Sequence, residues 1–188
     1  MLKYDKVSNI TTTWINKMNK KYIGVCVASL LAIVGCSSTV PSSAGDVEVT
    51  TQHDKFKSQT WVETPFYVIR TGFTDRFPVR VKYRLMKSKN SVKFIQLYVV
   101  ATRMDWGFYN QAVSEDGVNI RFTEISRSVD KTTNIVMVKE HFALNLSTSD
   151  LEKMSRKDWE IKIYGKNDEG VFIVPAHLTK GFLDAIEK

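Results

Sequence analysis

The sequence predicts a mainly β domain, an antiparallel β-sandwich of about eight strands that also carries two helices. Residues 79–85 alternate between apolar and basic side chains, which is typical of a strand with one buried face. Turn residues recur about every ten positions between such segments. Near the end of the chain, Leu178, Phe182 and Ile186 recur at helical spacing. Together these patterns indicate an immunoglobulin-like sandwich with a short helix near residues 149–155 and a C-terminal helix.

The predicted strands follow one another along a domain that begins between Val47 and Trp61. Residues 92–104 are apolar on both parities, which indicates a central strand covered on both sides. Asp116-Gly117 lies between two strand-like segments, and Asp-Gly favours a hairpin turn. The eight predicted strands are residues 66–69, 79–85, 92–104, 108–114, 118–125, 135–146, 159–163 and 171–174.

Two segments have the signals of helices. Ser149 and Glu152 fit a capping box, and the following turn contains Met154. Pro175 is a plausible entry to a helix over residues 176–187, whose apolar stripe is expected to dock on a sheet.

The N-terminal part of the chain has a different character. Lys20 and Lys21 precede thirteen residues, 23–35, that include no charge and no proline. A basic segment, a short apolar run and a small residue at its end describe a secretory signal. The run ends in Ile33-Val34-Gly35-Cys36, and a cysteine directly after the small residue resembles the lipobox of a bacterial lipoprotein signal.

The resemblance implies a processed and lipidated chain. In that family a diacylglycerol is transferred to the cysteine thiol, a peptidase cuts before the cysteine, and the freed amine is often acylated as well. Residues 1–35 would then be the signal peptide, and Cys36 would join the domain to a membrane through two or three acyl chains, enough for a stable anchor. Ser37 follows the cysteine, and in Gram-negative families serine there usually allows export to the outer membrane. We therefore expect an outer-membrane protein that faces the periplasm, with the cell surface as the other location that fits.

Other interpretations of the leader fit less well. A membrane-spanning helix needs about 20 apolar residues, more than this run contains. Ordinary signal cleavage favours an A-x-A-like site, and nothing after Cys36 offers a better one. Usual signal lengths also favour Met18 as the true start over Met1.

Removal of residues 1–35 would leave 153 of the 188 residues, enough for one domain. Five basic residues and one acidic residue leave with the signal, so the formal net charge falls from +7 to +3. A net charge of +3 is far smaller than the positive charge that is typical of a nucleic-acid-binding domain. Residues 36–46 are rich in Ser and predict a flexible tether, followed by a single domain over 47–188. Cys26 leaves with the signal and Cys36 takes lipid, so no disulfide is expected.

No pattern indicates catalysis, a metal or a cofactor. His53, His141 and His177 match no metal-ligand spacing, and no serine-hydrolase or phosphate-binding motif occurs. A glycoside hydrolase would need a pair of carboxylates, but nothing in the sequence shows that any two converge. The candidate carboxylates are Glu63, Glu115, Asp116, Glu124 and Glu140.

Two features favour binding instead. Arg80, Lys82 and Arg84 share one parity of a strand, so they could meet acidic polymers, lipid head groups or an acidic protein. They could equally be a solvated face, or charges that guard an edge strand. Trp106, Phe108 and Tyr109 form an aromatic cluster at a strand bend, which if exposed would stack on a sugar ring or anchor a partner. If buried, the cluster is a corner of the core.

These observations predict a membrane-anchored envelope lipoprotein that is not an enzyme and binds an envelope protein or polymer. Two alternatives remain open. The first is an envelope hydrolase that acts on glycan or lipid. The second is a carrier of an apolar ligand inside the sandwich.

Overall fold

The computed structural model describes residues 39–69, 77–89, 91–130 and 135–188, all of which belong to one compact unit, Ser37–Lys188. The predicted signal peptide and the lipidation site Cys36 lie outside the described residues. Among those that are described, no helix is both long and apolar enough to cross a membrane.

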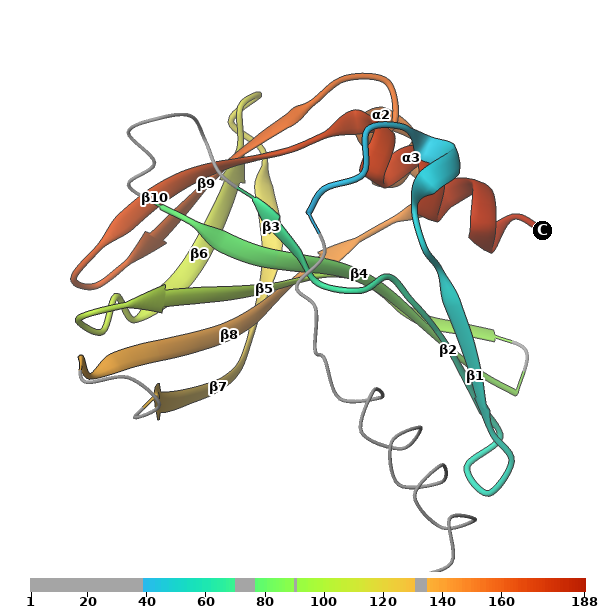
Figure 1. Ribbon diagram of the computed structural model, residues 1–188, viewed down its shortest axis with the longest axis horizontal. Coiled ribbons are helices and arrows are strands. Elements are labelled where there is room, and N and C mark those ends of the chain that lie inside the picture. Colours follow the sequence, from blue (N-terminus) through green and yellow to red (C-terminus); the bar gives the residue numbers. More distant parts are fainter. Residues whose placement is uncertain (1–38, 70–76, 90, 131–134) are drawn as a thin grey trace, which may run out of the picture. The chain divides into compact units, whose positions relative to one another are not determined.

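The predicted fold class is confirmed: the described residues form an antiparallel sheet of ten strands with two α-helices (Figure 1). The sheet order is β1-β2-β4-β5-β8-β7-β6-β9-β10, and β3 pairs with β4 beside β2. All eight predicted strands occur. The strands are β1 Thr50–Asp54, β2 Gln59–Glu63, β3 Tyr67–Ile69, β4 Val79–Ser88, β5 Ser91–Arg103, β6 Tyr109–Ser114, β7 Asn119–Asp130, β8 Met137–Leu146, β9 Trp159–Gly165 and β10 Glu169–Val174.

The two strands that the sequence did not place, β1 and β2, form a hairpin that projects from one end of the sheet (Figure 1). Every residue of Thr50–His53 is exposed, so β1 has no apolar face to produce a period of two. Pairing with β2, and not burial, holds it in the sheet.

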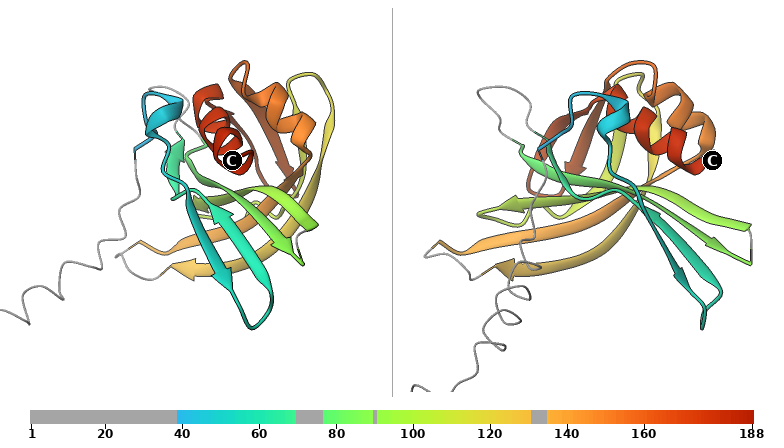
Figure 2. Two further views of the ribbon diagram at one scale, coloured as in Figure 1. Left: turned by 90° about the vertical axis from the view of Figure 1, so that its right-hand side faces the viewer. Right: turned by 45° about the vertical axis from the view of Figure 1, so that its right-hand side comes forward.

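The sheet folds over at β7 into two facing layers, which gives it a sandwich-like form (Figure 2). Asn119 and Ile120 pair with β6, whereas the residues from Arg121 onward pair with β8. One layer thus contains β1, β2, β3, β4, β5, β8 and β7, and the other contains β6, β9 and β10.

Side chains from both layers fill the space between them. On β4 the alternate residues Val81 and Tyr83 are fully buried, as the apolar period predicted. On β5 both parities are covered in the middle, since Gln96 and Val100 are buried on one face and Leu97 on the other. The prediction of a central strand is confirmed.

The two helices lie at one end of the sheet (Figure 1). Helix α2, Thr148–Met154, begins with a capping box, but its members are Ser147 and Asp150, not the expected Ser149 and Glu152. Ser147 has the extended backbone that an N-cap requires and its hydroxyl accepts from the Asp150 N–H at 3.1 Å. The prediction of the cap was therefore wrong by two residues.

Helix α3, Ala176–Ile186, closes the open end of the core. Phe182 stacks on Tyr83 with 5.1 Å between ring centroids, and the Tyr83 hydroxyl lies 2.6 Å from the Thr179 hydroxyl. Burial raises the pKa of the Tyr83 phenol. Pro175 precedes the helix, and the Asp158 carboxylate accepts the first free N–H, that of Ala176, at 2.8 Å.

Part of the predicted tether is folded. Val40 packs against the core, and residues 44–46 form a 3₁₀ helix, η2, beside α3. Gly181 makes this approach feasible, because a Cβ there would collide with the side chain of Val47. The tether is thus shorter than the expected 36–46.

Candidate functional site

The basic row Arg80, Lys82 and Arg84 lies on one face of β4, as its parity predicted. Strand β4 pairs with β2 and β3 on one side and with β5 on the other. The alternative that these charges guard an edge strand is therefore wrong.

Each basic side chain of the row is engaged by its neighbours. The Lys82 ammonium lies 2.8 Å from a Glu63 carboxylate oxygen, and Arg84 Nε donates to Gln96 at 2.9 Å. Desolvation lowers the pKa of Arg84. Among the described residues Arg80 has no carboxylate partner, but its guanidinium lies 5.4 Å from the Phe66 ring centroid.

Aromatic rings fill the gaps between these cations. Phe66 and Tyr98 meet edge to face at 5.8 Å, and the Arg84 guanidinium lies 4.3 Å from the Tyr98 ring centroid. The Tyr98 hydroxyl is 3.0 Å from His141 Nδ1. Such stacking shields the charges partly from water. The row is a half-buried layer of cations and rings, not a freely solvated basic patch.

The aromatic cluster lies at the turn between β5 and β6, here called the β5–β6 corner and comprising residues 104–109. The structure divides the cluster. Tyr109 is only 1% exposed and belongs to the core, so the expectation that it contacts a partner is corrected. Phe108 is 37% exposed and Trp106 is half-buried, with 6.3 Å between their ring centroids. The buried alternative thus holds for Tyr109, and the exposed alternative holds in part for Phe108 and Trp106.

A buried carboxylate holds the corner in shape. Glu140 on β8 has a side chain that is 5% exposed, and its two oxygens accept backbone N–H groups from Gly107 at 2.7 Å, Phe108 at 3.1 Å and Tyr109 at 3.3 Å. Arg127 Nε on β7 donates to the same carboxylate at 3.0 Å. Because a buried charge is stable only with such partners, the corner and the carboxylate depend on each other.

The turn between β9 and β10 supports the corner from the other side (Figure 1). The Asn167 side chain donates to the Trp106 carbonyl at 3.1 Å, and the Tyr109 hydroxyl donates to Asp168 at 2.7 Å. Burial raises the pKa of the Tyr109 phenol, and the bond to Asp168 adds to that effect. A Cβ at Gly165 would collide with the Gly107 carbonyl, so glycine is required for this close approach.

An open cavity of about 700 Å³ lies at the corner. Its rim carries the exposed Met104 and the rings of Trp106 and Phe108, next to the hydrogen-bonding groups of the β9–β10 turn. The Arg127 guanidinium lies 5.1 Å from the centroid of the Phe108 ring and so packs against that ring. Rings beside hydrogen-bonding groups can stack on a sugar ring or clasp a side chain of another protein. The lining residues are Arg103, Met104, Asp105, Trp106, Phe108, Asn167 and Asp168.

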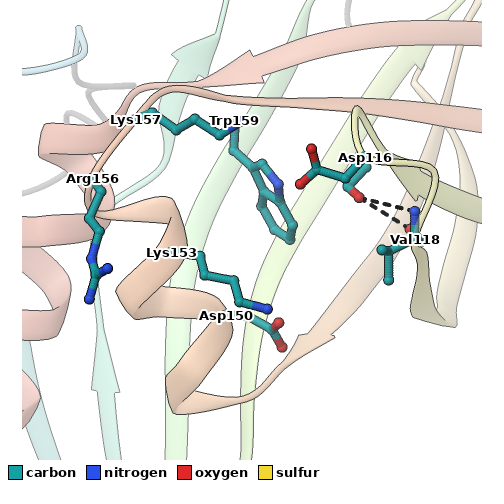
Figure 3. Close-up of a pocket in the computed structure, with 8 residues that line it drawn as sticks. Asp116, Val118, Asp150, Lys153, Arg156, Lys157 and Trp159 are labelled. Carbon is teal, nitrogen blue, oxygen red and sulfur yellow. Dashed lines mark hydrogen bonds between the residues drawn. The ribbon is translucent and has the colours of Figure 1, made fainter.

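A smaller pocket of about 300 Å³ lies between α2 and the β6–β7 turn (Figure 3). Trp159 stands in its middle, and Lys153 and Lys157 approach from the helix and the loop that follows it (Figure 3). Lys157 pairs with Glu115, and this contact raises the pKa of its ammonium. Asp150 is held by the capping box. Two of the charged groups that line this pocket are thus held by residues outside its lining.

Four of the five candidate catalytic carboxylates serve as counterions, and the fifth, Asp116, lines the smaller pocket. Glu63 pairs with Lys82 and Glu115 with Lys157. Glu124 and Glu140 do converge, but on Arg127, with Glu124 at 2.7 Å from that guanidinium. No cluster of three metal-ligating side chains occurs in the residues described by the structure.

One feature of the sequence could have predicted the buried carboxylate that holds the corner. On β8 the inward positions are Val138, Glu140, Phe142 and Leu144, so Glu140 is a charge at a core position. A charge at such a position indicates a buried partner, which here is the backbone of the corner.

The chain has no match among protein-family models, and no curated protein or solved structure matches it significantly.

Proposed function

We propose that this chain is a lipid-anchored envelope protein, without catalytic activity, whose β domain binds an envelope polymer or protein at the β5–β6 corner. The observation that carries the proposal is the rigid presentation of Trp106 and Phe108 at the rim of an open, polar cavity. The lipobox ending at Cys36 supplies the anchor by resemblance, and the short segment after it keeps the domain close to the membrane.

Rigidity is the argument for function at the corner. Phe108 has φ of +53°, a left-handed backbone that costs a non-glycine residue free energy. The four hydrogen bonds to Glu140 maintain this conformation. Their combined effect is to keep a large apolar residue 37% exposed, although full burial would stabilise the fold more. Binding energy from a partner is the physical reason that best explains the arrangement.

The carboxylates favour binding over hydrolysis. A general acid must exchange its proton with substrate, but Glu140 accepts from four donors and Glu124 lies against Arg127. An envelope hydrolase therefore has weaker support. A carrier of an apolar ligand has weaker support as well, because it would need a cavity between the two layers of the sheet. The side chains of Tyr83, Phe142, Phe172 and Phe182 belong to the hydrophobic core there.

A pull-down in the native envelope tests the binding site. The full-length chain is crosslinked in cells, and isolated cell-wall polymer is pelleted with it in a parallel assay. We expect Trp106→Ala with Phe108→Ala to reduce recovery of the partner at least about tenfold, the loss of roughly 1.4 kcal/mol or more that an anchor residue supplies. Polymer and protein partners are distinguished by which of the two assays responds.

Phe56→Ala is the matched control, since Phe56 is 90% exposed on the β1–β2 turn, outside the corner. It should leave recovery unchanged. Equal loss in both variants, or no reproducible partner with the wild type, would contradict the proposal.

The anchor is tested separately with Cys36→Ser. The wild type should sediment with membranes, and the variant should appear in the supernatant because it lacks the thiol that carries the diacylglycerol. A wild type whose intact mass shows no lipid would refute the anchor and leave the binding site to be judged on its own.

A further inference from the structure

Strand β7 presents an unpaired edge along most of its length. One edge of β7 pairs with β8 from Arg121 to Asp130, while β6 occupies the other edge only at Asn119 and Ile120. In Figures 1 and 2, β7 forms the outer border of its layer. Residues 121–129 therefore have no strand on that side among the residues the structure describes. An edge of this length is a template for pairing with another strand.

The sequence of this edge is complementary to itself. Two copies in antiparallel orientation, with a two-fold axis between Ile125 and Ser126, place Arg121 opposite Asp130 and Glu124 opposite Arg127. The same register places Phe122 opposite Val129 and Thr123 opposite Ser128. Apolar pairs directly across two strands each contribute about 0.2–1 kcal/mol, and every such pair occurs twice in a symmetric dimer. The charged pairs add less, because Glu124 and Arg127 already contact each other within one chain at 2.7 Å and Asp130 already pairs with Lys139.

The β-bulge in β7 makes this register consistent. Opposed residues in an antiparallel pair must share a face, but residues nine apart on a regular strand lie on opposite faces. The bulge between Glu124 and Ser126 adds one residue to the strand, so residues nine apart across it lie on the same face. Arg121 and Asp130 both lie opposite outward positions of β8, and Phe122 and Val129 both lie opposite the inward positions Leu144 and Val138.

The bulge does not stop pairing along β7, because β8 follows the strand on both sides of it. A second copy carries the same irregularity at the two-fold axis, so the ladder can continue on both sides. The pairing would cover Ile125 and Val129, which are 41% and 47% exposed.

From these observations we infer that the chain forms a homodimer by antiparallel pairing of β7 with β7 in this register, giving a sheet continuous across both copies. The interface is a single strand pair, below the area of a standard protein–protein interface, and its affinity is modest. This inference does not depend on the anchor or on the β5–β6 corner.

Disulfide trapping in the full-length chain tests the register. Thr123→Cys with Ser128→Cys puts each cysteine opposite its counterpart in the second copy, within disulfide range. The two lie about 13 Å apart along one strand, since they face residues of β8 that are four positions apart, and cannot bridge within a chain. Mild oxidation followed by non-reducing electrophoresis should give at least about five times as much covalent dimer as either single variant.

The single variants Thr123→Cys and Ser128→Cys are the matched controls, because each keeps the strand and the outward face while its cysteine lies opposite an unchanged residue of the second copy. Dimer in a single variant as abundant as in the double variant, or no dimer in the double variant, would overturn the inference.

A second measurement needs no new cysteine. The mass of the purified wild type in solution should rise toward that of a dimer with concentration, and Arg121→Asp should weaken dimerisation at least about fivefold because two carboxylates then oppose each other. Arg156→Asp makes the same charge change on an exposed residue beyond α2 and should have no effect. A wild type that stays monomeric up to about 100 µM, roughly the range of weak specific dimers, would overturn the inference independently.

Discussion

Glu140 shows how one side chain can determine the conformation of a segment more than thirty positions away. Its carboxylate replaces the hydrogen-bond partners that the turning backbone of Gly107, Phe108 and Tyr109 cannot find within a strand. A buried carboxylate requires donors, and a buried turn requires acceptors, so each satisfies the other.

We therefore expect Glu140→Gln to lower the free energy of unfolding by about 2 kcal/mol, since the amide presents two donors where the corner needs acceptors. Urea denaturation measures the change. Glu124→Gln is the control: Glu124 also contacts Arg127, but its side chain is 51% exposed, so a loss below about 0.5 kcal/mol is expected. Equal losses would show that the hydrogen bonds of Glu140 do not stabilise the corner.

His141 gives the basic row a pH dependence. Desolvation, and then the positive charges of Arg80 and Lys139, lower its pKa below the ordinary 6.5. The unfolded state therefore binds the proton more tightly than the folded state, so the contribution of His141 to stability is present above about pH 6.5 and is lost as the pH falls toward the folded pKa.

Unfolding free energies of wild type and His141→Gln, measured between about pH 7.5 and 5.5, check this expectation. The wild type should lose stability on acidification, and the variant should lose less. A larger acid loss in the variant would mean that the shift has the opposite sign.

At the scale of the element, α2 shows what a local motif can and cannot specify. Ser147 and Ser149 both precede residues that could complete a capping box, and the sequence pattern favoured the second. The strand β8 ends at Leu146, and the extended backbone that leaves it continues through Ser147. The element before the helix therefore decides where the helix begins.

Ser147→Ala should cost about 1 kcal/mol of stability, the usual effect of removing an N-cap hydroxyl. Ser149→Ala is the matched control, and it should have little effect because Ser149 is exposed within the first turn. Chemical denaturation of both variants measures the difference. A greater loss of stability in Ser149→Ala than in Ser147→Ala would show that Ser149 is the N-cap, as the sequence predicted.

At the scale of the whole molecule, α3 closes the end of the folded sheet and joins distant parts of the chain. Phe182 stacks on Tyr83 of β4, and Gly181 receives the segment that contains η2. The apolar stripe predicted from Leu178, Phe182 and Ile186 is thus the contact through which the helix completes the core.

Phe182→Ala should reduce the unfolding free energy by about 3–5 kcal/mol, because it leaves a cavity under a fully buried helix face. Lys180→Ala on the same helix loses only an exposed ion pair with Asp184, and a change below about 0.5 kcal/mol is expected. Thermal or urea unfolding compares the two. A loss under 1 kcal/mol for Phe182→Ala, roughly the effect of a surface substitution, would mean that α3 does not complete the core.

The sequence by itself determined the fold class, eight of the ten strands, the helix positions and the single face shared by Arg80, Lys82 and Arg84. These follow from periodicity, because a strand or helix with one buried face records that face in its own residues. It also determined the lipobox resemblance, which depends on adjacent residues alone.

Only the tertiary structure decided that Tyr109 is buried while Phe108 is exposed, that Glu140 holds the corner, and that residues 40–46 join the domain. It also decided that β4 is internal and that β7 has an open edge. Each of these depends on which segments meet in space, and hydrogen bonds between residues far apart in the chain leave no periodic mark in the sequence around either partner.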